Sequence, residues 1–278
     1  MTRLLVVMPT LNQGEFIERS IVSLVSQLTP EDIFVVVDGG STDRTPAILE
    51  KYVNQITHIH VVPGSSQAQA LEYGFTNHQA KFACYLNSDD LLLPGAVESA
   101  LSILNQSEYS AVYSHRLFID PQDGLQNTWV LPPHNSYLMK RWDYIPQETC
   151  FWRYDKMMQV GGINAELQFA VDYDLFVRLM QQGTFYRANE FWGAFRVHED
   201  SKTQRQIGLG QKEVRAIQLR LGIKSKLWDR VLGGLLRRFV EWRASRWMQD
   251  KSFSAQHEDR VHKSVTADIL LTPPPSSQ

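Results

Sequence analysis

Two groups of aspartates in this sequence each follow an apolar run. Asp38 comes after Ile33–Val37, and Asp89 and Asp90 come after Phe82–Leu86. If both runs are strands of one parallel sheet, their carboxyl ends meet at a crevice of the kind where open α/β sheets bind ligands. Adjacent carboxylates in such a crevice repel each other unless a cation lies between them. The pattern therefore predicts a site for Mg²⁺ or Mn²⁺, because these ions bridge one or two carboxylates and a substrate diphosphate.

Each group of aspartates, taken alone, is explained equally well by local structure as by a metal site. Residues 89–94 could be a loop and a helix cap, and residues 38–43 could be a glycine-rich turn with side-chain-to-backbone hydrogen bonds. The second segment is not followed by Gly-Lys-Ser/Thr, and the G-x-G-x-x-G pattern is missing. Phosphate loops of the Walker type and dinucleotide sites are therefore disfavoured.

The elements that must position these aspartates alternate between strand and helix. Strands buried on both faces are predicted at 4–8 and 33–37, and further strands at 56–62 and 82–86. Helices are predicted from residue 15 and at 45–52, 67–77 and 94–104. Later elements are predicted as helices at 154–160 and 172–182, a strand at 191–197, and helix from residue 212 onward. The βαβα order predicts an α/β fold with a mostly parallel sheet and helices on both faces.

The composition excludes several classes of protein. The 278 residues are 43% hydrophobic and 21% charged, which is typical of a globular protein with a sizeable core. A net charge of -2 gives no reason to expect a nucleic-acid partner. Cys84 and Cys150 both lie in apolar runs, so neither a disulfide framework nor a thiolate metal site is expected. The N-terminus lacks a signal-peptide pattern, and no run approaches the roughly 18 apolar residues that span a bilayer, so the cytoplasm is the expected location.

Four ordered segments of the chain together resemble the motifs of glycosyltransferase family 2, an inverting family with the GT-A fold. The segments are Met8-Pro9-Thr10-Leu11-Asn12, Val37–Asp43, Leu86-Asn87-Ser88-Asp89-Asp90 with Pro94–Ala96 behind it, and Ile145–Thr149 through Val160–Gly162 to Val171–Leu175. The resemblance covers about residues 3 to 205. It implies a metal-dependent enzyme that moves a sugar from a nucleotide-sugar donor to a glycan or glycolipid acceptor, in polysaccharide, lipopolysaccharide or glycolipid assembly.

The resemblance also implies roles for individual residues. Donor nucleotide contacts would come from Pro9, Thr10, Asn12, Asp38, Gln67 and Asp89. The divalent metal, Mn²⁺ or Mg²⁺, would be held mainly by Asp90, with Asp89 and His198. Arg196 would contact the diphosphate, because a guanidinium fork suits phosphate oxygens. Asp172 stands where the family has its catalytic aspartate and would act as the general base, with Asp174 as its rival and an ordinary helix cap as the alternative.

The sequence departs from the family pattern at three places. Val171 precedes Asp172 where the family usually has glutamate, Asn87 replaces the first acid of the D-x-D motif, and Gln69 stands where many members have an aspartate. These departures leave open a catalytically silent carbohydrate-binding or scaffold protein with the same fold. A sugar nucleotidyltransferase is a second alternative, which is disfavoured because residues 12–15 stand where its glycine-rich basic loop would lie.

The expected organisation is a GT-A domain over residues 1–222, with a donor half at about 1–115 and an acceptor half at about 116–222. A basic amphipathic helical extension is expected at 223–263, and a disordered tail at 264–278. The extension mixes tryptophan and leucine with arginine, which favours contact with anionic lipid at the inner face of the membrane. The alternative is a terminal helix packed on the core, with its arginine side chains extended to solvent.

Overall fold

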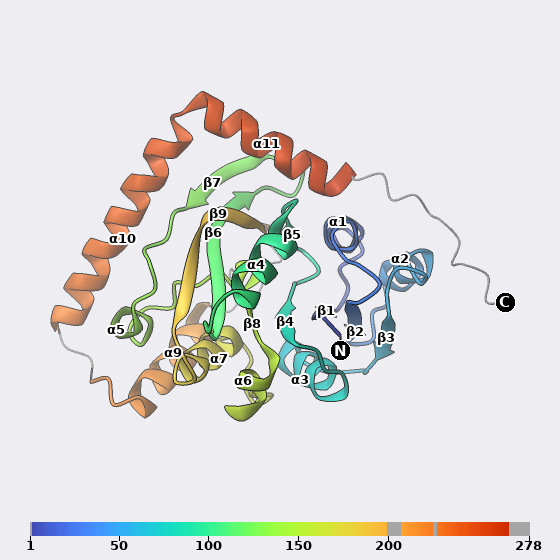
Figure 1. The fold of residues 1–278 in the computed structure, drawn as a ribbon, viewed down its shortest axis with the longest axis horizontal. Coiled ribbons are helices and arrows are strands. Elements are labelled where there is room, and N and C mark those ends of the chain that lie inside the picture. Colours follow the sequence, from blue (N-terminus) through green and yellow to red (C-terminus); the bar gives the residue numbers. More distant parts are fainter. Residues whose placement is uncertain (1, 199–206, 225–226, 267–278) are drawn as a thin grey trace.

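The computed structural model describes residues 2–198, 207–224 and 227–266 (Figure 1). Within these residues one nine-stranded sheet has the order β3-β2-β1-β4-β8-β6-β9-β5, with β7 paired to β6. The strands are β1 (Leu4–Thr10), β2 (Ile33–Asp38), β3 (His58–Val61), β4 (Phe82–Tyr85), β5 (Leu91–Leu92), β6 (Ala111–Ile119), β7 (Leu125–Trp129), β8 (Phe151–Arg153) and β9 (Phe185–Arg196). The helices are α1 (Ile17–Val25), α2 (Thr45–Lys51), α3 (Gln67–Asn77), α4 (Ala96–Asn105), α5 (Ser136–Met139), α6 (Tyr154–Gln159), α7 (Val171–Leu179), α9 (Ile207–Arg220), α10 (Leu227–Met248) and α11 (Lys251–Thr266), with a 3-10 turn η1 (Gln147–Thr149).

The first half of the sheet is parallel, as the sequence predicts. β1 pairs in parallel with β2 and with β4, and β2 pairs in parallel with β3. All seven residues of β1 are buried, which explains why its sequence is a continuous apolar run rather than an alternating one. The shorter strands of the second half add antiparallel pairs, of β8 with β4 and β6, of β5 with β9, and of β7 with β6. β9 begins at Phe185, six residues before the predicted strand, because it pairs in parallel with nearly all of β6.

The start of α3 explains one departure from the family pattern. The Ser66 hydroxyl accepts a hydrogen bond from Gln69 N at 3.3 Å, and the Gln69 side chain accepts one from Ser66 N at 2.9 Å. This reciprocal capping box satisfies two backbone N–H groups that a helix start leaves without partners. Gln69 therefore stabilises the helix start.

The close packing of α3 on β1 gives a first testable prediction. A Cβ atom on Gly74 would lie 2.6 Å from Val7 Cγ1, so an alanine there forces the helix away from the central strand. We expect Gly74→Ala to lower the free energy of unfolding by about 1–3 kcal/mol, the usual range for overpacking. Urea unfolding followed by circular dichroism measures it. Gly208→Ala in α9 is the matched control, because its Cβ meets nothing within 4 Å and alanine favours helix. Equal effects of the two substitutions would contradict the packing argument.

The last two helices pack back onto the sheet. α10 runs along one side of the molecule, and α11 crosses its top near β7, β5 and α1 (Figure 1). Val261 of α11 is buried in a second apolar cluster with residues of β5, β6 and β9, and Arg260 donates to Phe191 O at 3.0 Å. The inner sides of these helices thus pack against the core, as the alternative to membrane contact predicts. A truncation that removes both helices would expose this cluster.

The end of α11 corrects part of the expected tail. The helix continues to Thr266, and Ser264 is 1% exposed, so residues 264–266 are folded rather than disordered. Residues 267–278 lie outside the described residues. Among the described helices, none is long and apolar enough to cross a membrane.

Candidate active site

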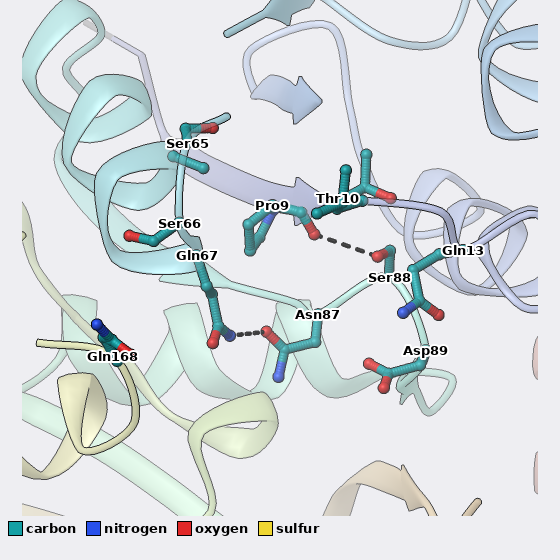
Figure 2. A pocket seen from close by; sticks show the side chains of 12 residues that line it. Pro9, Thr10, Gln13, Ser65, Ser66, Gln67, Asn87, Ser88, Asp89 and Gln168 are labelled. Carbon is teal, nitrogen blue, oxygen red and sulfur yellow. Dashed lines mark hydrogen bonds between the residues drawn. The ribbon is translucent and has the colours of Figure 1, made fainter. Parts of the chain in front are cut away.

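A pocket of about 420 Å³ lies where β1, the β4–β5 loop and the start of α3 meet (Figure 2). It is lined by Pro9, Thr10, Leu11, Gln13, Ser65, Ser66, Gln67, Ala70, Asn87, Ser88, Asp89 and Gln168. Four of the residues expected to contact the donor nucleotide are among them, namely Pro9, Thr10, Gln67 and Asp89. Gln67 Nε2 donates to Asn87 Oδ1 at 2.6 Å, which ties the helix start to the acidic loop.

Asn12 and Asp38, the other two expected nucleotide contacts, do not line this pocket. The Asp38 carboxylate is 3% exposed and accepts from Ser41 Oγ at 2.6 Å and Ser41 N at 3.0 Å. Asn12 has a left-handed backbone, with φ 52, and its side chain accepts from Thr42 N at 2.8 Å. Both residues shape the loop after β2, as the turn alternative predicts.

Asp89 lines both pockets and is paired with His198. His198 Nε2 lies 3.1 Å from Asp89 Oδ2, and its ring packs against Phe16 with centroids 4.7 Å apart. The Asp89 loop is fixed on its other side, because Ser88 Oγ donates to Pro9 O at 3.2 Å and Ser20 Oγ donates to Ser88 O at 2.9 Å. The loop therefore presents the Asp89 carboxylate at the pocket (Figure 2).

The geometry does not favour Asp90 as the principal metal ligand. Its carboxylate is fully buried, lines neither pocket, and accepts from Arg196 N at 3.1 Å and Gln147 Nε2 at 3.3 Å. Burial, with the nearby charges of Asp89 and Glu148, raises the pKa of Asp90 well above its usual range. Asp90 lies behind Asp89 and joins it to β9 and η1.

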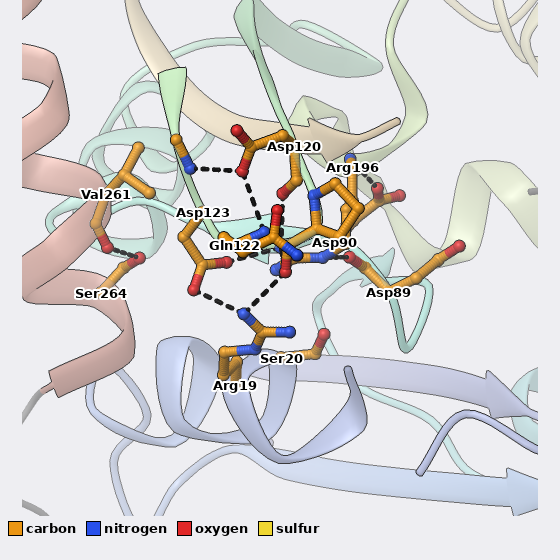
Figure 3. A network of polar contacts seen from close by, with 12 residues as sticks. Arg19, Ser20, Asp89, Asp90, Asp120, Gln122, Asp123, Arg196, Val261 and Ser264 are labelled. Carbon is orange, nitrogen blue, oxygen red and sulfur yellow. Dashed lines mark hydrogen bonds and ion pairs between the residues drawn. The ribbon is translucent and has the colours of Figure 1, made fainter. Parts of the chain in front are cut away.

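Arg196 is not placed to contact a diphosphate. Its side chain is fully buried and donates to Asp89 O at 2.9 Å, Asp120 O at 3.0 Å and Asp123 Oδ1 at 2.5 Å (Figure 3). Asp123 also accepts from Arg19 of α1 at 2.7 Å. The network connects β9, the β6–β7 turn and α1 behind the acidic loop. Arg196 thus supports the backbone that carries Asp89.

A metal ion would have a small set of protein ligands in this arrangement. Among the described residues, no three His, Cys, Asp or Glu side chains gather as a complete metal site. Asp89 offers a carboxylate oxygen and His198 an imidazole nitrogen, and both suit Mn²⁺, while carboxylate alone suits Mg²⁺. Such an ion would take its remaining ligands from a bound diphosphate and water.

A second pocket of about 330 Å³ adjoins the first and shares Gln67, Asn87 and Asp89 with it. Asp172 lines this second pocket from the first turn of α7 and accepts from Tyr173 N at 2.8 Å. Burial raises the pKa of Asp172, and the hydrogen bond from the backbone opposes the shift.

Asp174, the rival of Asp172, is on a different side of α7. It is fully buried and accepts from Arg178 at 2.6 and 2.9 Å, and it also pairs with Arg220 of α9. Residues two apart on a helix do not share a face, which explains the separation. Asp172 therefore lines the pocket, whereas Asp174 joins α7 to α9.

Two features of the second pocket have no signal in the sequence pattern. Asp143 lines the pocket beside Asp172 from the loop after α5, where residues show no strand or helix periodicity. Arg116 also lines it and pairs through two hydrogen bonds, at 2.6 and 2.5 Å, with the buried Glu148 of η1. The pairing of the buried Glu148 with Arg116, 32 residues earlier in the chain, could not be predicted from either local segment.

A comparison with protein-family models identifies the family of this chain. Residues 5–158 match the family model described as Glycosyl transferase family 2. The match covers more than half of the chain, so the chain belongs to this family. Asp172 and His198 lie beyond the matched residues.

Among curated proteins, an uncharacterised glycosyltransferase of Rickettsia typhi is 24% identical over 71% of this chain and 65% of its own length. The hyaluronan synthase of Pasteurella multocida is 24% identical over 73% of this chain and 21% of its own length. The chain thus spans less than two thirds of the length of these relatives.

Solved structures show the same fold. S. aureus TarS 1–349 in complex with UDP-GlcNAc is similar with a TM-score of 0.62 and 18% identity, over 73% of this chain and 61% of that one. The mannosyltransferase PcManGT of Pyrobaculum calidifontis, in complex with GDP-Man and Mn²⁺, is similar with a TM-score of 0.55 and 16% identity, over 96% and 88%. These likenesses confirm the GT-A fold.

Proposed function

We propose that this chain transfers a sugar from a nucleoside-diphosphate donor to a hydroxyl group of a glycan or glycolipid acceptor, with inversion at the transferred carbon. The observation that carries the proposal is the pair of adjoining pockets, which share Asp89 and have Asp172 in the second. The relatives support it, since TarS binds UDP-GlcNAc, PcManGT binds GDP-Man with Mn²⁺, and one curated relative is a hyaluronan synthase. Assembly of a polysaccharide, lipopolysaccharide or glycolipid is the process we propose.

The residues divide the reaction between the two pockets. Pro9, Thr10 and Gln67 would hold the nucleotide in the first pocket, and Asp89 with His198 would hold the divalent ion at its border. When bound there, Mn²⁺ or Mg²⁺ would offset the negative charge of the departing diphosphate. In the second pocket Asp172 accepts the proton of the acceptor hydroxyl as that oxygen attacks the sugar carbon. A single attack from the face opposite the diphosphate inverts the carbon.

The decisive experiment is donor turnover. The purified chain is incubated with UDP-, GDP-, dTDP- and CDP-sugars, with and without Mn²⁺, and release of nucleoside diphosphate is measured. We expect one nucleotide class to be hydrolysed slowly in a metal-dependent way and to raise the melting temperature, because a ligand that binds only the folded state stabilises it. Binding of a donor without any turnover would favour the catalytically silent carbohydrate-binding alternative.

The outer face of α10 supports a proposal of peripheral membrane contact. Leu235, Phe239 and Trp242 recur at helical spacing and are 59%, 49% and 53% exposed. Arg243 lies 5.9 Å from the Phe239 ring and Arg246 lies 5.2 Å from the Trp242 ring. Apolar side chains flanked by arginines fit the interface of an anionic bilayer, and would place the protein at the inner face of the membrane.

The membrane proposal predicts a specific loss of binding. Phe239→Glu with Trp242→Glu is expected to weaken sedimentation with vesicles of phosphatidylglycerol and phosphatidylcholine by at least about tenfold, because each buried aromatic side chain contributes about 1.5–3 kcal/mol. Donor hydrolysis should be unchanged. The control is Leu219→Glu, since Leu219 is 55% exposed on a different helix, α9. If the wild-type protein does not sediment with these vesicles, the proposal is wrong.

A further inference from the structure

We propose that the second pocket selects sugars that carry no acidic group, through the carboxyl side chains of Asp143 and Asp172. The inference rests on the proposed transferase function and adds the class of sugar to it. It covers the transferred sugar and the acceptor sugar alike, because both must meet at Asp172.

The charges that line the pocket carry the inference. The acidic lining residues are Asp89, Asp143 and Asp172, and the basic one is Arg116. Arg116 donates through Nε and Nη2 to the two carboxylate oxygens of Glu148, which is 2% exposed. The positive charge of Arg116 is therefore neutralised within the protein. Asp89 is the acid that we assign to the divalent ion, so the Asp143–Asp172 pair supplies the negative charge that remains in this pocket.

The hydrogen-bonding chemistry of the pocket points in the same direction. An ionised carboxylate only accepts hydrogen bonds, and the hydroxyl groups of a neutral sugar can donate them. A carboxylate or phosphate on the sugar has no proton to donate at neutral pH and adds a like charge. Burial and the charge of Asp172 already raise the pKa of Asp143 well above its usual range. An ionised acidic group on a substrate would be disfavoured for the same two reasons, namely burial away from water and repulsion by the charge of Asp172.

The rest of the lining suits an uncharged ring. Phe118, Trp129, Tyr144, Phe169 and Phe195 line the pocket. Aromatic faces pack well against the apolar C–H face of a sugar ring, while a few polar groups fix its orientation. The pocket thus combines apolar walls with acceptors for hydroxyl protons.

The test compares matched sugars that differ in one group. Phenyl hexosides and phenyl hexuronides are offered as acceptors, and UDP-hexose and UDP-hexuronic acid as donors. We expect kcat/KM to favour the neutral member of each pair by at least about tenfold, because like charges held close together repel each other. Asp143→Lys should reduce this preference by at least about tenfold. The size-matched Asp143→Asn, with nucleotide affinity as a readout, shows whether position 143 tolerates substitution, and the exposed Glu72→Lys controls for overall charge.

The outcomes separate the two proposals. Hexuronides used as well as hexosides, or an unchanged preference in a folded Asp143→Lys variant, would overturn the charge selection while donor hydrolysis still supported a transferase. A protein that binds donors but releases no nucleoside diphosphate from any of them would count against the transferase function itself. A preference for neutral acceptors but not for neutral donors would overturn the claim that the pocket selects both sugars.

Discussion

Asp172→Asn is expected to lower turnover by about 10²–10⁴-fold, the range for loss of a general base, with donor affinity nearly unchanged. Asparagine keeps the size of the side chain and removes its basicity. Asp172 lines the second pocket, and Asp89 lines both pockets. In the proposed reaction, Asp172 therefore lies where an acceptor hydroxyl would lose its proton. Steady-state kinetics and isothermal titration with nucleoside diphosphate measure the two effects separately.

The pH dependence of the wild-type enzyme provides a second measurement of the same role. A base must be ionised to accept a proton, so activity is lost as pH falls through the pKa of Asp172. Burial raises that pKa, so the acid limb of kcat/KM should lie above the ordinary range of an aspartate, about 3.9. An acid limb at or below pH 3.9 would contradict Asp172 as the base.

Asp174→Asn is the matched control for Asp172→Asn. Asp174 is fully buried between Arg178 and Arg220, so its replacement leaves buried charge without a partner. We expect a loss of about 2–3 kcal/mol in the free energy of unfolding, below the full range for buried pairs because Arg220 is half exposed. The reversed pattern, an inactive but stable Asp174→Asn and an active Asp172→Asn, would move the base to Asp174.

Asp89→Ala is expected to abolish the dependence of donor binding on Mn²⁺ and to leave the fold intact. Asp89 is the acid of the loop that lines both pockets, and its carboxylate lies 3.1 Å from His198. The measurement is donor affinity across a Mn²⁺ titration, with circular dichroism as the check on folding. His198→Ala should weaken the metal dependence in the same direction.

Asp90→Ala should behave differently from Asp89→Ala. Asp90 is fully buried and accepts from Arg196 N and Gln147 Nε2, so its loss leaves those donors without their partner. A lower melting temperature is the expected result. If Asp90→Ala were fully stable and lost all metal dependence while Asp89→Ala kept it, the metal would belong to Asp90.

Local signals predicted the N-terminal half of the molecule well. β1, β2 and β4 appear where continuous apolar runs stand, because a strand buried on both faces needs only apolar side chains in sequence. α3 begins and ends at the predicted residues, since its capping box and its helical spacing are both local. The position of Asp89 at a strand end followed from the same pattern.

The second half was harder to predict because its contacts join distant segments. Arg196 ends β9, and its burial depends on Asp120 and Asp123, which lie more than 70 positions earlier. Asp143 comes from a loop without periodicity, and only the fold brings it to Asp172. Polar residues near a strand end therefore indicated candidate site residues. The hydrogen-bond partners of Arg196 and Asp90, however, could be identified only from the three-dimensional structure.

The packing of α11 has a consequence for how the chain folds during synthesis. α11 contacts α1, and Val261 completes an apolar cluster with Leu91 and Leu93, which directly follow the Asp89 loop. Contacts between segments so far apart in sequence form late and slow folding. The N-terminal half of the nascent chain can form its parallel strands early, but the loop that carries Asp89 lacks part of its support until α11 has left the ribosome.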